Sequence, residues 1–205
     1  MKKNIARALL VAVTLVAACD DQYSAPTTPS TGTTSDSVPG PAYSRSAASQ
    51  AKRVAFGFNG TASGFPLGAV FLTGGGSYDP TTASNTAGDT TTDVHSGGGF
   101  RCIDEVGQGP LNKCLTDEGV RWDTVQLLAS APFKCTATDA VKTAVTGSGR
   151  AVLLADFYRA GDGIDESFTA QMIVSDTDLA PNIPGVQTLW IQGVGCATAK
   201  VNFNG

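Results

Sequence analysis

Apolar and polar residues alternate with a period of two in three separate parts of this chain, residues 53–59, 167–175 and 197–204. The apolar positions are Val54, Phe56, Phe58; Phe168, Ala170, Met172, Val174; and Ala197, Ala199, Val201, Phe203. Successive side chains of a strand point to opposite faces, so this pattern predicts strands with one buried face and one solvated face. Such strands are typical of antiparallel sheets.

Five further segments have the length and apolar content of strands: Ala69–Thr73, Val94–Arg101, Val141–Thr146, Ala151–Arg159 and Thr188–Gln192. Glycine-rich turns separate some of them, and for Gly147-Ser148-Gly149 and Gly161-Asp162-Gly163 we expect hairpins with positive φ angles. Val120–Ala129 fits a helix or a strand, and we favour a strand because its surroundings are all-β. Together the segments predict an all-β domain, an antiparallel sandwich or small barrel of about eight strands.

The chain divides into three parts by composition. Residues 1–18 read as a signal peptide, residues 19–52 as a flexible Ser/Thr/Pro-rich linker, and residues 53–205 as a single β-rich domain. The linker has almost no large apolar side chains, so we expect it to stay a disordered tether. Within the domain, residues 74–99 run from one glycine triplet to another, and we expect a Gly/Thr-rich loop that is disordered rather than functional.

Four cysteines lie in the predicted domain: Cys102, Cys114, Cys135 and Cys196. An even number in an exported chain predicts two disulfides, with three possible pairings. We prefer Cys102–Cys114 with Cys135–Cys196, because the second bond would close a long loop and contribute about 4 kcal/mol in the chain-entropy model. The spacing of the cysteines does not match a zinc site, and we expect no metal there.

A short leader precedes Val16-Ala17-Ala18-Cys19. It begins with the basic residues Lys2, Lys3 and Arg7 and continues with an apolar run that is too short to span a bilayer. These residues resemble the lipobox of bacterial lipoproteins. The resemblance implies cleavage before Cys19, a diacylglyceryl group on its thiol and acylation, as with palmitate, of its amine. Two or more acyl chains anchor a protein stably to a membrane.

The anchor would place the domain outside the cytoplasm, attached to the cell envelope. Asp20 and Asp21 follow the cysteine and resemble an inner-membrane retention signal of enteric bacteria. That signal is not shared by all phyla, so a periplasmic and a surface-facing location both stay open.

The predicted mature chain is acidic. Residues 1–18 hold three of the 14 Lys and Arg residues and none of the 18 acidic ones, so their removal leaves a net charge of −7. This sign argues against a nucleic-acid partner and against electrostatic binding to anionic lipids. The partners we expect are the membrane, through the lipid anchor, and a protein or glycan ligand.

Few residues suggest catalysis. His95 is the sole histidine, and no Gly-x-Ser-x-Gly motif accompanies it, so we expect it at a loop or strand end without a catalytic role. Three acidic pairs, Asp104-Glu105, Asp117-Glu118 and Asp165-Glu166, could serve a hydrolase only if two carboxylates faced each other across a cleft. We interpret them as solvated surface charges.

Two other sets of residues could bind a ligand. Asp156, Asp162, Asp165 and Glu166 offer oxygen atoms that suit Ca²⁺, although they do not form an EF-hand pattern and a tight hairpin explains them without metal. The aromatic residues Trp122, Trp190, Tyr158 and Tyr78 could stack on a sugar or peptide if exposed, but core packing is expected for both tryptophans.

The second half of the chain is similar to β-rich domains of secreted bacterial proteins of unknown role. The residues that carry this resemblance are Phe133-Lys134-Cys135, Ala155-Asp156-Phe157, Gly161-Asp162-Gly163 and Cys196. The resemblance implies export and a β fold and brings no catalytic residues. The sequence therefore predicts a lipid-anchored lipoprotein, not an enzyme and without a cofactor, whose β-domain binds, inhibits or supports the envelope. The alternative is a hydrolase of envelope polymers that uses acidic residues.

Overall fold

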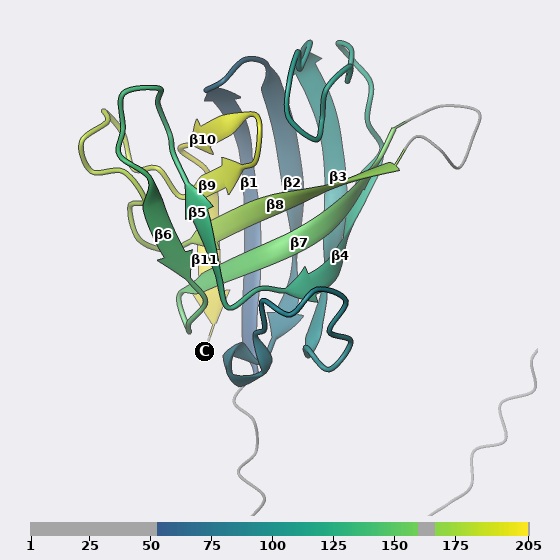
Figure 1. Ribbon diagram of the computed structural model, residues 1–205, viewed down its shortest axis with the longest axis vertical. Coiled ribbons are helices and arrows are strands. Elements are labelled where there is room, and N and C mark those ends of the chain that lie inside the picture. The colour runs from purple at the N-terminus through teal and green to yellow at the C-terminus, as the bar shows by residue number, and fades with distance from the viewer. Residues whose placement is uncertain (1–52, 160–166, 205) are drawn as a thin grey trace, which may run out of the picture. The chain divides into compact units, whose positions relative to one another are not determined.

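The computed structural model describes residues 53–159 and 167–204 (Figure 1). These residues form eleven strands and one short 3-10 helix. In chain order they are β1 (Val54–Gly64), β2 (Ala69–Tyr78), η1 (Pro80–Thr82), β3 (Val94–Asp104), β4 (Arg121–Leu127), β5 (Ser130–Phe133), β6 (Lys142–Val145), β7 (Arg150–Tyr158), β8 (Ser167–Ser175), β9 (Leu189–Ile191), β10 (Gly195–Ala197) and β11 (Lys200–Asn204). Within the described ranges, no helix has the length and hydrophobicity needed to span a bilayer.

Eight strands form a closed antiparallel barrel in the order β1, β2, β3, β4, β7, β8, β9 and β10. The barrel closes where β10 returns to the end of β1, through the pairs Ser63↔Cys196 and Gly64↔Gly195. β11 pairs with the earlier part of the same edge of β1, from Ala55 to Asn59. The all-β prediction is confirmed, and of the two architectures left open the barrel is the one observed.

The alternation of apolar residues determines which side chains enter the barrel. Val54, Phe56 and Phe58 of β1 are all buried in its interior, as predicted. Within Val120–Ala129 the chain forms a strand, as we favoured, over Arg121–Leu127, and Trp122 of this strand is fully buried in the same core. Burial of these side chains is the main stabilising contribution, at roughly 25 cal/mol per Å² of apolar surface removed from water.

A second, smaller core lies on the outer side of the barrel wall. In β7 and β8 the two faces serve different cores, because Leu153 and Met172 belong to the interior cluster whereas Val152 and Ile173 belong to the outer one. The hairpin β5–β6, inserted between β4 and β7, supplies Ala131, Phe133 and Ala144 to the outer core. The hairpin therefore covers part of the wall from outside, at the left of Figure 1.

The prediction of a loop over residues 74–99 is wrong. Both glycine triplets lie within strands and pair with each other, through Gly74↔Gly98 and Gly75↔Gly97. The physical reason is space: a Cβ at Gly74 would stand 2.5 Å from Cζ2 of Trp122, and one at Gly98 would overlap the Thr73 carbonyl oxygen. Glycine is used here for close packing inside the barrel, not for flexibility.

The true connection between β2 and β3 is shorter, residues 79–93, and it has defined structure. Asp79 caps η1 by accepting hydrogen bonds from the backbone N–H and the hydroxyl of Thr81. The buried Gln126 side chain donates from Nε2 to the carbonyl oxygens of Ser84 and Thr86, 2.8 Å each. These hydrogen bonds hold the connection in place without large apolar side chains.

The prediction for Gly147-Ser148-Gly149 also needs correction. The segment does make a tight turn between β6 and β7, closed by an antiparallel bridge between Gly147 and Arg150. However, neither glycine has a positive φ angle, and the two strands belong to different sheets. A Cβ at Gly149 would overlap the Asp176 carboxylate, so the glycine makes room for a neighbouring side chain. Gly161-Asp162-Gly163 lies outside the described residues.

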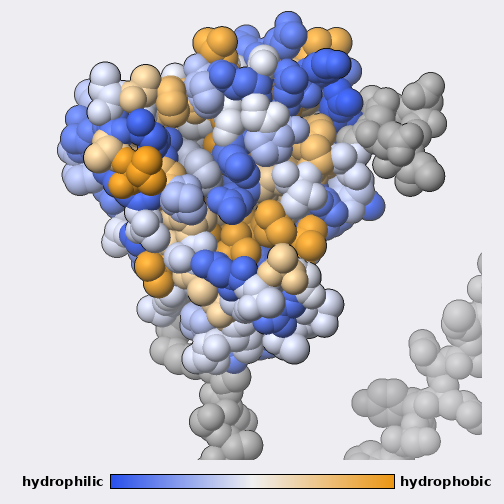
Figure 2. Space-filling model, viewed as in Figure 1, coloured by the Kyte–Doolittle hydropathy of each residue, from blue (hydrophilic) through white to orange (hydrophobic). Residues whose placement is uncertain are grey.

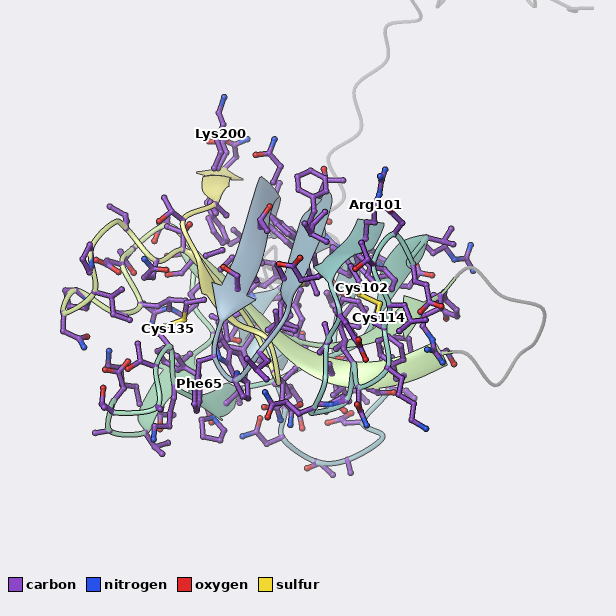
Figure 3. All side chains as sticks on the ribbon, turned by 90° about the horizontal axis from the view of Figure 1, so that it is seen from above. Phe65, Arg101, Cys102, Cys114, Cys135 and Lys200 are labelled. Carbon is purple, nitrogen blue, oxygen red and sulfur yellow. A yellow bond between two sulfur atoms is a disulfide. The ribbon has the colours of Figure 1, made fainter. Side chains whose placement is uncertain are left out.

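Both disulfides are present in the preferred pairing. Cys102–Cys114, with a Cα–Cα distance of 6.2 Å, joins the end of β3 to the connection that follows it. Cys135–Cys196, with a Cα–Cα distance of 5.1 Å, joins the segment after β5 to β10. In Figure 3 the first bond and Cys135 lie toward opposite sides of the barrel.

Candidate binding pocket on the outer wall

Large side chains fill the barrel interior. The fully buried ones include Trp122, Tyr78, Phe157, Leu72 and Leu111. Small eight-stranded barrels either are filled by side chains, as here, or hold one small ligand. A ligand-sized pocket lies on the outer wall.

This space is a pocket of about 370 Å³ beside the β5–β6 hairpin. It is formed by the hairpin, by β8, by the turn from β9 to β10 and by the turn after β1. Its lining residues are Phe65, Pro66, Pro132, Phe133, Lys134, Val141, Gln171, Trp190, Gln192 and Gly193. A volume of this size is within the usual range for ligand pockets, roughly 300–1,000 Å³.

Two largely buried aromatic residues of the lining, Phe133 and Trp190, make up the part of the pocket that we call its floor. Phe133 and Trp190 are 5% and 6% exposed, and their rings meet edge to face with centroids 6.1 Å apart. Trp190 is also held by a hydrogen bond from its Nε1 to the carbonyl oxygen of Lys134, 2.9 Å long. The indole therefore has a fixed position, and only part of each ring is accessible from the pocket.

The pocket is built on rigid elements. The Cys135–Cys196 disulfide follows the residues contributed by β5 and holds them against the barrel wall. At the rim, the backbone N–H of Phe65 donates to the carbonyl oxygen of Val194, 3.1 Å away. Gly195 has a φ of 115°, and a Cβ there would meet the Phe65 backbone nitrogen at 2.8 Å. The turn after β1 and the turn after β9 are thus packed against each other.

Two glutamine side chains bring amide groups to the pocket. Gln192 accepts at Oε1 from the backbone N–H of Gln171, 3.1 Å away, while its own N–H donates to the Gln171 carbonyl oxygen. This leaves Nε2 of Gln192 and the whole side-chain amide of Gln171 without hydrogen-bond partners among the described residues. A bound molecule can use both groups.

Among the residues described, one charged residue, Lys134, belongs to the pocket lining. Lys134 donates from Nζ to the carbonyl oxygen of Ala137, 3.1 Å away, and forms no ion pair within the described ranges. No carboxylate belongs to the described lining. The local charge is therefore positive on a chain whose net charge is −4.

Comparisons of the chain with protein-family models, with curated proteins and with solved structures find no match. The chemistry of a ligand has to be inferred from the residues of the pocket themselves. These residues offer recessed aromatic rings, two amide groups and one ammonium group.

His95 lies on β3 with 79% of its side chain exposed. Its Nε2 is 3.6 Å from Oδ1 of Asp93, and that oxygen accepts a hydrogen bond from Arg53, 2.6 Å long. No residue of the pocket is involved in this group. Arg53 is the first described residue, so the Arg53–Asp93 pair ties the beginning of the domain to the β2–β3 connection.

The acidic pairs that the structure describes lie away from the pocket. Asp104, Glu105 and Asp117 are exposed. Glu118 accepts a hydrogen bond from the backbone N–H of Leu115 and is 3.5 Å from Arg159. Asp165-Glu166 lies outside the described residues.

Of the proposed calcium ligands, the structure describes Asp156 alone, whereas Asp162, Asp165 and Glu166 lie outside the described ranges, as does Cys19. Asp156 accepts a hydrogen bond from the Thr169 hydroxyl, 2.6 Å long, and stands opposite Asp123 on β4. Within the described part of the chain, no group of three His, Cys, Asp or Glu side chains is arranged to hold a metal ion.

The aromatic candidates separate by location. Trp122 and Tyr78 are fully buried in the barrel, and the Arg121 guanidinium lies over the Tyr158 ring at 4.8 Å. Core packing of Trp122 is confirmed, while Trp190 both packs in the outer core and lines the pocket. The other lining residues were not predicted, although the preferred Cys135–Cys196 pairing could have brought Phe133 and Trp190 together.

Proposed function

We propose that this chain is an exported, lipid-anchored lipoprotein of the bacterial cell envelope, and that its barrel is a non-enzymatic binding domain. The outer pocket is the binding site. The anchor is the acylated Cys19, which follows the signal peptide of residues 1–18. The observation that carries the binding role is an aromatic pocket beside the Cys135–Cys196 disulfide, on the outer wall of a barrel whose interior holds large buried side chains.

The disulfides support the extracytoplasmic location. Two disulfides, Cys102–Cys114 and Cys135–Cys196, are present in one small domain. Such bonds form and persist in oxidising compartments and are rare in the bacterial cytoplasm. The disulfides therefore favour export on grounds that do not depend on the leader sequence.

The direction of β1 supports the anchor and the pocket acting together. β1 runs from Val54, next to Arg53, to Gly64 at the other end of the barrel (Figure 1). The next residue, Phe65, lines the pocket. Eleven residues of strand span about 35 Å. A tether that enters at Arg53 would leave the Phe65 rim well away from the attachment point.

The hydrolase alternative has less support. A glycosidase needs two carboxylates about 5–10 Å apart across a cleft. The one described cross-strand pair of carboxylates on the wall, Asp123 and Asp156, is held by Arg121 at 3.5 Å and by Thr169. The described lining of the pocket contains no carboxylate.

Site-specific photo-crosslinking in the native envelope tests the binding role without assuming the ligand. The full-length protein carries benzoylphenylalanine in place of Val141, which lines the pocket, or in place of Val145. The two valines are 66% and 59% exposed and four positions apart, so Val145 is a matched control outside the pocket.

We expect a reproducible adduct, whether protein, glycan or lipid, from position 141 and a much weaker one from position 145. The adduct should disappear when Lys134→Glu is added. Equal labelling from the two positions would contradict the assignment of the pocket as the binding site.

A further inference from the structure

We propose that the pocket binds an extended segment of a partner protein in which a large apolar side chain is followed by an acidic residue. This inference rests on the proposed function, because it names the ligand of the same pocket. The apolar side chain enters between Phe133, Trp190 and Val141. The partner's main chain meets the two glutamine amides, and its carboxylate meets Lys134.

The shape of the floor favours an inserted side chain over a sugar ring. Sugars bind by stacking on an exposed aromatic face, but Phe133 and Trp190 are only 5% and 6% exposed, so little of either ring face is accessible. An aliphatic or aromatic side chain fits such a recess and removes apolar surface from water on both partners.

The free amides match a peptide main chain. A peptide group has one N–H donor and one carbonyl acceptor, and Gln171 offers both an acceptor and a donor while Gln192 offers Nε2. Gln171 and Gln192 are adjacent across the β8–β9 junction, since the backbone N–H of Gln192 bonds to the Gln171 carbonyl at 2.9 Å. Leaving these groups unpaired beneath a purely apolar ligand would cost about 1–3 kcal/mol each.

Lys134 supplies the charge preference. It is the sole charged group of the described lining, and it has no carboxylate partner within the described ranges. An acidic residue next to the inserted side chain would gain this ammonium group as a partner. Repulsion from the acidic remainder of the chain would disfavour acidic segments elsewhere on the surface.

Titrations of the ¹⁵N-labelled, disulfide-intact full mature chain with defined probes test the inference. The probes are an acetylated tetrapeptide with phenylalanine followed by aspartate, the same peptide with serine for phenylalanine, the same with lysine for aspartate, an N-acetylglucosamine trimer and decanoate. The readouts are the Trp190 indole N–H and the Gln171 and Gln192 side-chain amide signals.

We expect the first peptide to shift these signals and the serine and lysine peptides to bind at least about tenfold more weakly, a difference of about 1.4 kcal/mol. Lys134→Glu should remove the preference for aspartate over lysine, whereas Lys200→Glu, a matched change on a distant strand (Figure 3), should keep it.

Two outcomes would overturn the inference. One is stronger binding of the sugar or of decanoate at the same signals, which would leave a binding pocket but change its ligand class. The other is no change at these signals with any peptide up to about 10 mM, which lies beyond ordinary weak binding. Failure of crosslinking at position 141 is a separate result and would remove the proposed function itself.

Discussion

Trp122 determines which residues can stand opposite it inside the barrel. Its indole Nε1 donates to the Thr73 carbonyl oxygen, 3.1 Å away, and its ring covers the backbone of β2. Gly74 is the position directly beneath the ring. A residue with any side chain there has to displace either the indole or the neighbouring strand.

We therefore expect Gly74→Ala to lower the free energy of unfolding by about 1–3 kcal/mol, as overpacking in a core does. Gly107→Ala is the matched control, because a Cβ at Gly107 would meet no atom within 4 Å. Urea denaturation with the disulfides intact measures both. Equal stability of the two variants would show that Gly74 is not constrained by Trp122.

Tyr78 makes stability sensitive to alkaline pH. Burial raises the pKa of its hydroxyl, and the negative charge of Asp176 raises it further. Above the ordinary value of about 10, the unfolded chain releases this proton while the folded chain keeps it, so the free energy of unfolding falls as pH rises. Below that value the contribution is fully present.

Tyr78→Phe removes this source of pH dependence. It also loses the hydrogen bond from the Tyr78 hydroxyl to the Gly147 carbonyl, 2.6 Å long, which is worth about 1 kcal/mol. We expect the variant to be less stable than the natural chain at pH 7 but to lose less stability between pH 9 and about 11. Tyr158→Phe, on the outer wall, serves as control and should keep the full alkaline loss.

Among the elements, the β5–β6 hairpin depends on the Cys135–Cys196 disulfide. In the chain-entropy model, we expect the double variant Cys135→Ala, Cys196→Ala to lower the free energy of unfolding by about 4 kcal/mol. The double variant Cys102→Ala, Cys114→Ala should lower it by about 3 kcal/mol, because that disulfide closes a shorter loop. The first pair should also shift the Trp190 indole signal in NMR spectra, because Lys134 accepts its hydrogen bond. An unchanged Trp190 indole signal in the Cys135→Ala, Cys196→Ala variant would show that the hairpin keeps the structure of the pocket without the disulfide.

Sequence patterns predicted the elements better than the site. Alternation identified β1 and β8 because half of each strand faces a continuous core. β5 and β10 were missed, since strands of four and three residues are too short to show a period. The glycine triplets were misread because the atoms that crowd them, such as the Trp122 ring at Gly74 and the Thr73 carbonyl oxygen at Gly98, come from other strands.

The pocket could be predicted only in part. Its floor joins Phe133 to Trp190, and the sequence links these two residues solely through the preferred pairing of Cys135 with Cys196. Phe65 and Gln171 reach the pocket because the barrel closes, and no local pattern encodes that closure. Contacts between distant strands are set by the register of the whole sheet.

At the scale of the whole molecule, the proposed location depends on residues 1–19, and Cys19 is the position at which it can be tested. We expect Cys19→Ser to move the protein from the membrane pellet to the soluble fraction, because the variant lacks the acylated residue that we propose as its membrane anchor. The domain should keep both disulfides in this variant. Continued sedimentation with membranes would contradict the proposed anchor.

The seam of the barrel has a consequence for how the chain matures. β1 is synthesised before every other strand described here, yet one of its edges is completed by β10 and β11, the last two. Until those residues emerge, the oldest strand keeps an open flank and Cys135 lacks its bonding partner. The barrel therefore cannot close until nearly the whole chain has been synthesised. During that time chaperones can bind the open chain and proteases can cleave it.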